Sequence, residues 1–146
     1  MDYKFYGWQQ ADVKPVNERY SKIKDPRDMY DLLTKCWSPE TCAPRMRSEW
    51  REENRTKGQC SITAFLVQDI FGGKVYGVPL PDGNFHCFNV VGDCVFDLTS
   101  EQFGDKKLDY KNNPEQFRET HFKKEEKKAR YELLKENFEK ILDERG

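Results

Sequence analysis

No stretch of this 146-residue sequence stays apolar over the length that a membrane-spanning helix needs, which is about 20 residues. The first ten residues, "MDYKFYGWQQ", also lack the cationic start, the apolar segment and the small-residue cleavage pattern of a secretory leader. These absences argue against membrane insertion and export. They predict a cytoplasmic protein.

The sequence also lacks an excess of charge of one sign. Lys and Arg number 25 against 26 Asp and Glu, and the lysines of the C-terminal tail alternate with acidic residues. Without a basic face, neither nucleic acid nor an anionic membrane is an expected partner. What the chain does have is 14% aromatic residues, which argues against disorder, and a length that predicts a single domain over residues 1–146.

Cysteine pairs with the spacing of a zinc knuckle are absent too, because no two successive cysteines are separated by two residues. The five cysteines are Cys36, Cys42, Cys60, Cys87 and Cys94. In a reducing cytoplasm we expect most of them to pack as small apolar thiols. Zinc could in principle bind Cys60, His86, Cys87 and Cys94. However, neighbours on a strand point to opposite faces, so His86 and Cys87 should not both join such a site. We predict no metal and no cofactor.

Helical patterns occupy three parts of the chain. "DPRDMYDLLTKCW" starts with an acidic cap, Asp25, followed by proline at the first helical position. A central, mostly buried helix is expected from Cys60 until Gly72 and Gly73 stop it. The tail, residues 114–145, predicts a long helix laid across the sheet or the core, with one apolar stripe: Tyr131, Leu134, Phe138 and Ile141.

Three strands are expected between the central helix and the tail: "KVYGVPL", "FHCFNVV" and "CVFDLT". Gly92 and Asp93 favour a two-residue hairpin, which would place Val91 opposite Cys94. Phe88 would then lie opposite Asp97, and His86 would share their face of the sheet. His86 and Asp97 become diagonal neighbours, with backbones roughly 7 Å apart. A shift of one residue in the register would separate them.

Cys60, His86 and Asp97 together have the chemistry of a nucleophilic thiol site. Oriented N–H groups at a helix start lower the pKa of a thiol, an imidazole accepts its proton, and a carboxylate orients the imidazole. The chain order Cys, His, Asp resembles the papain-like superfamily in its NlpC/P60-type and transglutaminase-type arrangement. By that resemblance the oxyanion would be held by the Cys60 N–H and by Asn54 or Gln59.

Each of these residues also has a structural interpretation. Cys60 could be a buried thiol of an apolar helix, and His86 an ordinary strand histidine with its hydrogen bonds satisfied. Asp97 could cap the "DLTSEQF" turn instead of orienting a histidine. The other histidine, His121, lies in the charged tail and is expected to face solvent, so His86 is the predicted base.

Several short words occur in a specific order: "CWSPET", "GQCSITAFLVQDIFGG", "HCFN", "DLTSEQF" and "ARYELLKENF". Together they resemble the bacterial YunG family over Cys36 to Phe138, and the YunG-like region is expected to span residues 25–146. Cys87 and Phe88 depart from the Tyr and Trp that are usual there, and residues 1–24 would form an N-terminal extension. The resemblance bears on the fold and the site and does not specify a reaction.

These observations predict an α+β fold with a papain-like core. In it, the central helix that starts at Cys60 packs on a small antiparallel sheet, flanked by an N-terminal helix and a long C-terminal helix. One functional hypothesis is a cysteine-dependent hydrolase or acyltransferase that acts on a peptide, isopeptide or small amide through Cys60, His86 and Asp97. The alternative is a binding or structural module without turnover on the same scaffold.

Overall fold

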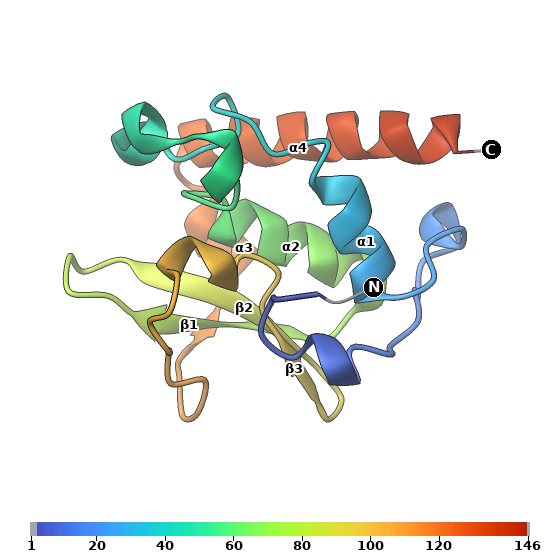
Figure 1. Cartoon of the computed structure of the whole chain (residues 1–146), viewed down its shortest axis with the longest axis horizontal. Helices are drawn as coiled ribbons and strands as arrows, with labels where there is room; N and C mark the ends of the chain where they lie inside the picture. The colour runs from blue at the N-terminus through green and yellow to red at the C-terminus, as the bar shows by residue number, and fades with distance from the viewer. Residues whose placement is uncertain (1–2, 146) are drawn as a thin grey trace.

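The computed structural model describes residues 3–145 and contains one antiparallel sheet. Its strands follow the order β3-β2-β1-β4 across the sheet (Figure 1). Their bounds are Lys74–Pro79 for β1, Phe85–Val91 for β2, Cys94–Phe96 for β3 and Glu115–Gln116 for β4. The three predicted strands are thus confirmed, with β3 shorter than expected, and the protein is α+β.

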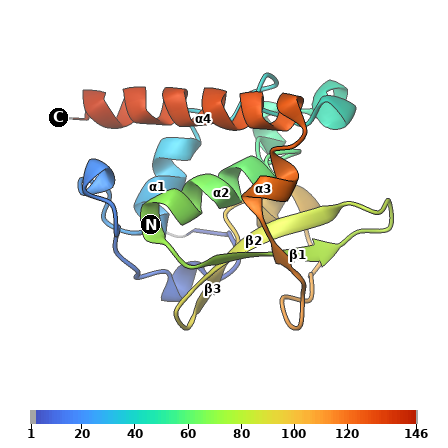
Figure 2. The ribbon, with the colours of Figure 1, turned by 180° about the vertical axis from the view of Figure 1, so that it is seen from behind.

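Helices cover one face of the sheet in two layers, as Figures 1 and 2 show from opposite sides. The inner layer contains α2, Cys60–Phe71, and the outer layer is α4, Glu125–Glu144. α2 is buried on nearly all sides because it lies between the sheet and α4. The predicted stop is confirmed: Gly72 and Gly73 both have positive φ, and a Cβ on Gly73 would lie 2.3 Å from the Val90 carbonyl oxygen.

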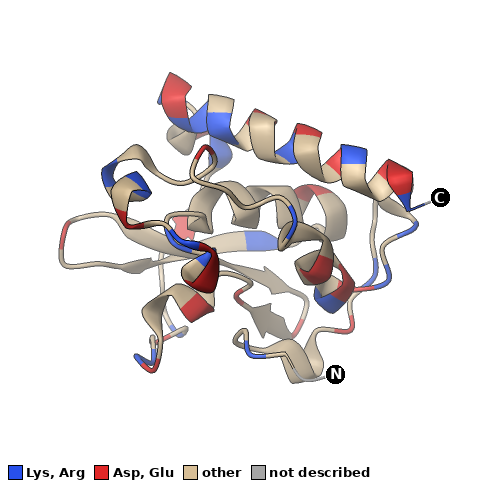
Figure 3. Ribbon diagram, turned by 45° about the horizontal axis from the view of Figure 1, so that its top comes forward, with Lys and Arg blue, Asp and Glu red and all other residues tan. Residues whose placement is uncertain are grey.

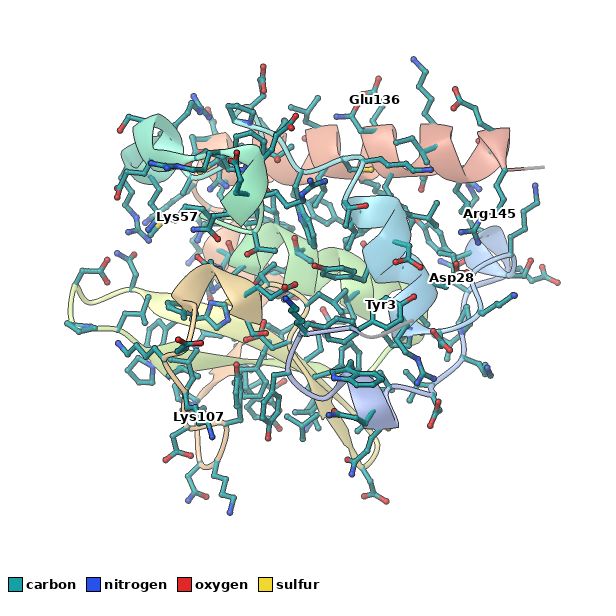
Figure 4. All side chains as sticks on the ribbon, in the orientation of Figure 1. Tyr3, Asp28, Lys57, Lys107, Glu136 and Arg145 are labelled. Carbon is teal, nitrogen blue, oxygen red and sulfur yellow. The ribbon has the colours of Figure 1, made fainter. Side chains whose placement is uncertain are left out.

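Helix α1, Pro26–Leu33, begins as the sequence predicted. The Asp25 carboxylate accepts hydrogen bonds from the backbone N–H groups of the first turn, and Pro26 occupies the first turn. The far end of α4 is tied to α1 by Arg145, whose guanidinium lies 2.8 Å from the Asp28 carboxylate (Figure 4). Charges of both signs are mixed along α4, as Figure 3 shows.

The tail does not form one long helix, and this prediction was wrong for residues 114–124. Glu115 pairs with Tyr76 as part of β4, and the Gly77 N–H donates to the Pro114 carbonyl oxygen at 3.0 Å. A short helix, α3, spans Arg118–His121 before α4 begins. The free edge of β1 offers hydrogen bonds that outweigh the helical tendency of this segment. α4 packs on α2, and Leu142 rather than Ile141 is its fully buried residue near the end.

The N-terminal segment contributes side chains to the core over residues 3–24, the part of it that the structure describes. The buried side chains in it are Phe5, Ala11, Tyr20 and Ile23. Tyr6 makes a β-bridge with Asp97, whose N–H donates to the Tyr6 carbonyl oxygen at 3.0 Å. The segment therefore lies beside the end of β3. Within residues 3–145 no helix combines the length and the apolar character that crossing a bilayer requires.

Candidate active site

The β2–β3 hairpin brings His86 and Asp97 together. Its register is the predicted one, with Val91 opposite Cys94 and Asn89 opposite Phe96. The next position along the chain is Asp97, which lies on the same face of the sheet as His86. The His86 Nε2 atom lies 2.6 Å from the Asp97 Oδ2 atom, and both side chains are only 1% exposed. The pairing inferred from the register is confirmed.

The two carboxylate oxygens of Asp97 have different partners. Oδ1 accepts hydrogen bonds from the Thr99 N–H at 3.1 Å and the Thr99 hydroxyl at 3.3 Å, which is the turn-capping interaction. Oδ2 is the partner of the His86 imidazole, and it also accepts a hydrogen bond from the Tyr110 hydroxyl at 2.7 Å. Capping and orientation, which the sequence left as alternatives, therefore occur together. Tyr110 was not predicted, because it lies in a polar loop with no local motif.

Cys60 occupies the start of α2 at an uncovered edge of β2. β1 pairs with one edge of β2 at residues 85–87, but β3 ends at Phe96, opposite Asn89, so the other edge of β2 has no strand beside it there. The Cys60 Sγ atom lies 3.8 Å from the Phe85 carbonyl oxygen at this edge. The backbone N–H groups of the first helical turn have no partners within the helix, and their dipoles favour a thiolate there.

The surroundings of Cys60 lower the pKa of its thiol well below the ordinary value. The largest cause is a hydrogen bond from the Cys87 thiol, followed by burial, which opposes the shift, and then by the nearby His86 imidazole and its charge. The pKa of Cys87 is raised, by the same hydrogen bond and by burial, so Cys87 is the protonated partner. The thiolate form of Cys60 is favoured.

His86 is held in its protonated form. Burial lowers the pKa of its imidazole, but the Asp97 charge, the Asp97 hydrogen bond and Cys60 together raise that pKa to about 10. Its Nδ1 atom is buried and has no hydrogen-bond partner among residues 3–145. The Phe103 ring meets the imidazole edge-on, with the ring centroids 4.6 Å apart. The ring is fixed by Asp97 through one nitrogen, and the other nitrogen remains free for Cys60.

Cys87 and His86 both lower the pKa of Cys60, although adjacent strand residues point to opposite faces of a sheet. The reason is that Cys60 lies at the edge of β2 and not over one face, so side chains from both faces approach it. Cys94 lies elsewhere, with its Sγ 3.1 Å from the Gln10 carbonyl oxygen. Among the described residues no group of three His, Cys, Asp or Glu side chains is arranged to hold a metal ion.

Gln59 and Asn54, the predicted oxyanion donors, do not line the cavity next to Cys60. The Gln59 side chain is fully buried and its amide donates to the Ser38 carbonyl oxygen at 3.1 Å. This hydrogen bond holds the Gln59 amide against the loop at Ser38, which precedes α2 in the chain, and away from the cavity. The backbone N–H groups of Cys60 and Ser61 are the better donors, because the helix leaves them unpaired.

Cys60 and His86 open onto a cavity of about 550 Å³. Its walls come from residues 43–58, from the turn between β1 and β2, and from α3 with the first turns of α4. His121 also lines it, so the prediction of a solvent-facing histidine was wrong: the imidazole packs edge-on against Phe65 at 5.2 Å. The apolar Phe122 that follows it was a sequence signal for burial.

Comparison with known proteins agrees with the sequence words quoted above. The family described as YunG protein matches residues 25–143. The chain is 32% identical over 112 residues to "Uncharacterized protein YunG" of Bacillus subtilis (strain 168), and the match covers 77% of this chain and 90% of that protein. No solved structure matches the chain. With most of its length matched by the family, this chain belongs to the YunG family.

Proposed function

We propose that the protein is a cysteine-dependent hydrolase or acyltransferase that acts on a peptide, isopeptide or small amide. The observation that carries this proposal is the state of His86. Its Nε2 is bound to Asp97 at 2.6 Å, its Nδ1 is free, and its imidazole acts on a thiol at a helix start. A thiolate beside an oriented imidazolium is the starting state for nucleophilic attack on a carbonyl carbon.

In the proposed reaction the Cys60 thiolate attacks the carbonyl carbon of the amide. The N–H groups of Cys60 and Ser61 stabilise the resulting oxyanion. The proton on His86 Nδ1 passes to the leaving nitrogen, the C–N bond breaks, and a thioester remains on Cys60. Water then attacks the thioester while Nδ1 takes its proton, and the acid leaves as the thiolate reforms. In acyl transfer an amine replaces the water.

The arrangement also supports a papain-like core. A helix that starts at the cysteine packs against an antiparallel sheet, and the histidine and the aspartate come from β2 and from the end of β3. The proposed location is the cytoplasm, where the five cysteines, all free thiols here, would stay reduced. A binding module on the same scaffold is the competing function, and it needs neither the thiolate nor the free imidazole nitrogen.

The test is the pH dependence of Cys60 alkylation by iodoacetamide in the native protein, with mass spectrometry to locate the label. We expect an apparent pKa well below the free-thiol value of about 8.5. In His86→Ala the pKa should move up towards that value, and the rate at pH 6 should fall about tenfold, since fewer thiolates form but each is more nucleophilic.

His121→Gln is the matched control. His121 lines the same cavity, but its pKa is lowered to about 4, so the ring is uncharged at pH 6 and its replacement should leave the Cys60 pKa nearly unchanged. His86→Gln serves if the alanine variant does not fold. Two results would contradict the proposed enzyme and favour the binding module. One is an ordinary thiol pKa for Cys60 that does not change when His86 is replaced, and the other is a Cys60 that reacts only after the protein unfolds.

A further inference from the structure

The wall of the cavity opposite the sheet is rich in cations. The basic residues that line the cavity are Arg45, Lys57, Lys124, Lys127 and Arg130, and its acidic residue is Glu126. An excess of positive charge around an enclosed space raises the local concentration of anions. In a chain with a net charge of −1, this local excess is not a consequence of overall composition.

Most of these cations already have a partner. Arg130 is paired with Glu126 and donates to the Thr41 carbonyl oxygen at 3.1 Å. Arg45 lies 3.0 Å from the Asp82 carboxylate, and Lys57 lies 4.0 Å from Glu49. Lys124 and Lys127, by contrast, have no carboxylate within ion-pair distance among residues 3–145, and Lys127 is the less exposed of the two.

Lys127 is positioned by a chain of two hydrogen bonds. Its Nζ atom donates to His121 Nδ1 at 2.9 Å, and His121 Nε2 lies 2.9 Å from the Gln116 Oε1 atom on β4. An imidazole that accepts at Nδ1 and donates at Nε2 is neutral, which leaves the ammonium of Lys127 as the charge. Two of its N–H donors remain for another group. The wall of the cavity thus presents a fixed cation that has no carboxylate partner among residues 3–145 and that interacts electrostatically with the Cys60 thiolate.

We propose that the amide substrate carries an anionic group, most simply a carboxylate, which binds Lys127 with Lys124 beside it while the scissile carbonyl lies at Cys60. This inference rests on the proposed function of Cys60. A half-buried ammonium with free donors is a good carboxylate ligand because the pair loses little solvation and is only partly screened. Neutral amides of the same size would bind less well.

Two alkylating reagents of nearly equal size, one anionic and one neutral, test the proposed anion site. Iodoacetate carries a carboxylate and iodoacetamide a neutral amide, and both react at Cys60 by the same displacement of iodide. The ratio of their second-order rate constants at pH 7 and low salt, with the label located by mass spectrometry, reports anion recognition. Because the ratio cancels the thiolate fraction, it is insensitive to changes in the Cys60 pKa.

Lys127→Met should lower the ratio of iodoacetate to iodoacetamide rates about fivefold, the effect of roughly 1 kcal/mol from one partly buried charge. The matched control is Lys128→Met, which removes the same charge from the neighbouring exposed position on α4, outside the cavity. It should leave the ratio unchanged, as should Lys127→Arg, which keeps the charge. Raising the salt concentration should lower the ratio in the unchanged protein.

An equal ratio in Lys127→Met and Lys128→Met would overturn the anion site. If Lys127→Met slowed both reagents equally, Lys127 would act on the thiolate and not on the substrate, which also overturns it while leaving the nucleophile intact. If neither reagent labelled Cys60 in the native protein, the proposed function itself would fail, and the anion site with it. Thermal unfolding of each variant verifies that it is folded.

Discussion

The two histidines of this chain lie on opposite sides of one cavity, and their surroundings shift the pKa values of the two rings in opposite directions. On the sheet side, His86 contacts a buried carboxylate, and its pKa is raised to about 10 despite burial. On the α3–α4 side, burial and the Lys127 ammonium lower the pKa of His121 to about 4. At neutral pH one ring is a cation and the other is neutral.

The comparison shows that burial does not by itself decide the charge of a histidine. Burial lowers the pKa of both rings, and the charge of the hydrogen-bonded neighbour determines the final direction. The two states suit two tasks. A protonated His86 can stabilise a thiolate and supply a proton, and a neutral His121 can hold a lysine by accepting its hydrogen bond.

Asp97→Asn should have the largest effect, because it removes the charge that holds the proton on His86. We expect the His86 pKa to fall below about 6.5 and the free energy of unfolding at pH 6 to drop by about 3 kcal/mol. A raised folded-state pKa stabilises the protein fully below about 6.5, and this contribution is lost as the pH rises through about 10.

The measurement is urea unfolding of both proteins between pH 6 and pH 10. The stability advantage of the unchanged protein over Asp97→Asn should shrink steadily across that interval. A constant advantage at every pH would show that Asp97 stabilises the fold without acting through the charge of His86.

His121→Gln should have a smaller effect on the free energy of unfolding, and this effect should appear at acidic pH. A folded-state pKa lowered to about 4 means that the unfolded chain binds the proton first, so stability falls as the pH drops from about 6.5 to about 4. Allowing for partial exposure, we expect this loss to be about 1–2 kcal/mol and to be absent from the variant. Urea midpoints at pH 7 and pH 4.5 measure it. Parallel acid losses in the two proteins would contradict the assignment.

Cys87→Ala tests how much of the lowered pKa of Cys60 depends on the neighbouring Cys87 thiol rather than on His86. The variant loses the hydrogen bond from the Cys87 thiol to Cys60, so the apparent pKa of Cys60 should rise while remaining sensitive to His86→Ala. Iodoacetamide rates against pH give both values. An unchanged midpoint would mean that Cys87 only fills space beside Cys60.

The smallest expected effect is that of Lys127→Met on its histidine neighbour. Removing the ammonium should raise the His121 pKa from about 4, yet keep it below 6.5, because burial is the larger cause of the shift. The proton NMR titration of the His121 ring measures it. A return to 6.5 would assign the whole shift to Lys127.

The local parts of the site could be predicted from the sequence. The extent of α2 follows from an apolar run that begins after Cys60 and is ended by two glycines. The contact between His86 and Asp97 follows from a two-residue turn. Such features are set by neighbours in the chain, where turn chemistry and periodicity act.

The long-range parts could not be predicted in the same way. Three contacts join residues that are far apart in sequence or carry no motif: the β-bridge of Tyr6 with Asp97, the hydrogen bond from the Tyr110 hydroxyl to Asp97, and the pairing of Glu115 with Tyr76. The length of β3 also mattered: because it ends at Phe96, Cys60 lies at a strand edge and contacts residues from both faces. Strand ends are set by tertiary pairing, which no local pattern reports.

The most direct test of the account is an NMR pH titration of the imidazole protons, since the chain has only two histidines and His121→Gln assigns them. We predict that one ring titrates near pH 4 and that the other, His86, stays protonated through neutral pH and titrates near 10. If both rings titrated near the ordinary value of about 6.5, the imidazolium at His86 would not exist at neutral pH, and the proposed thiolate pair would be contradicted.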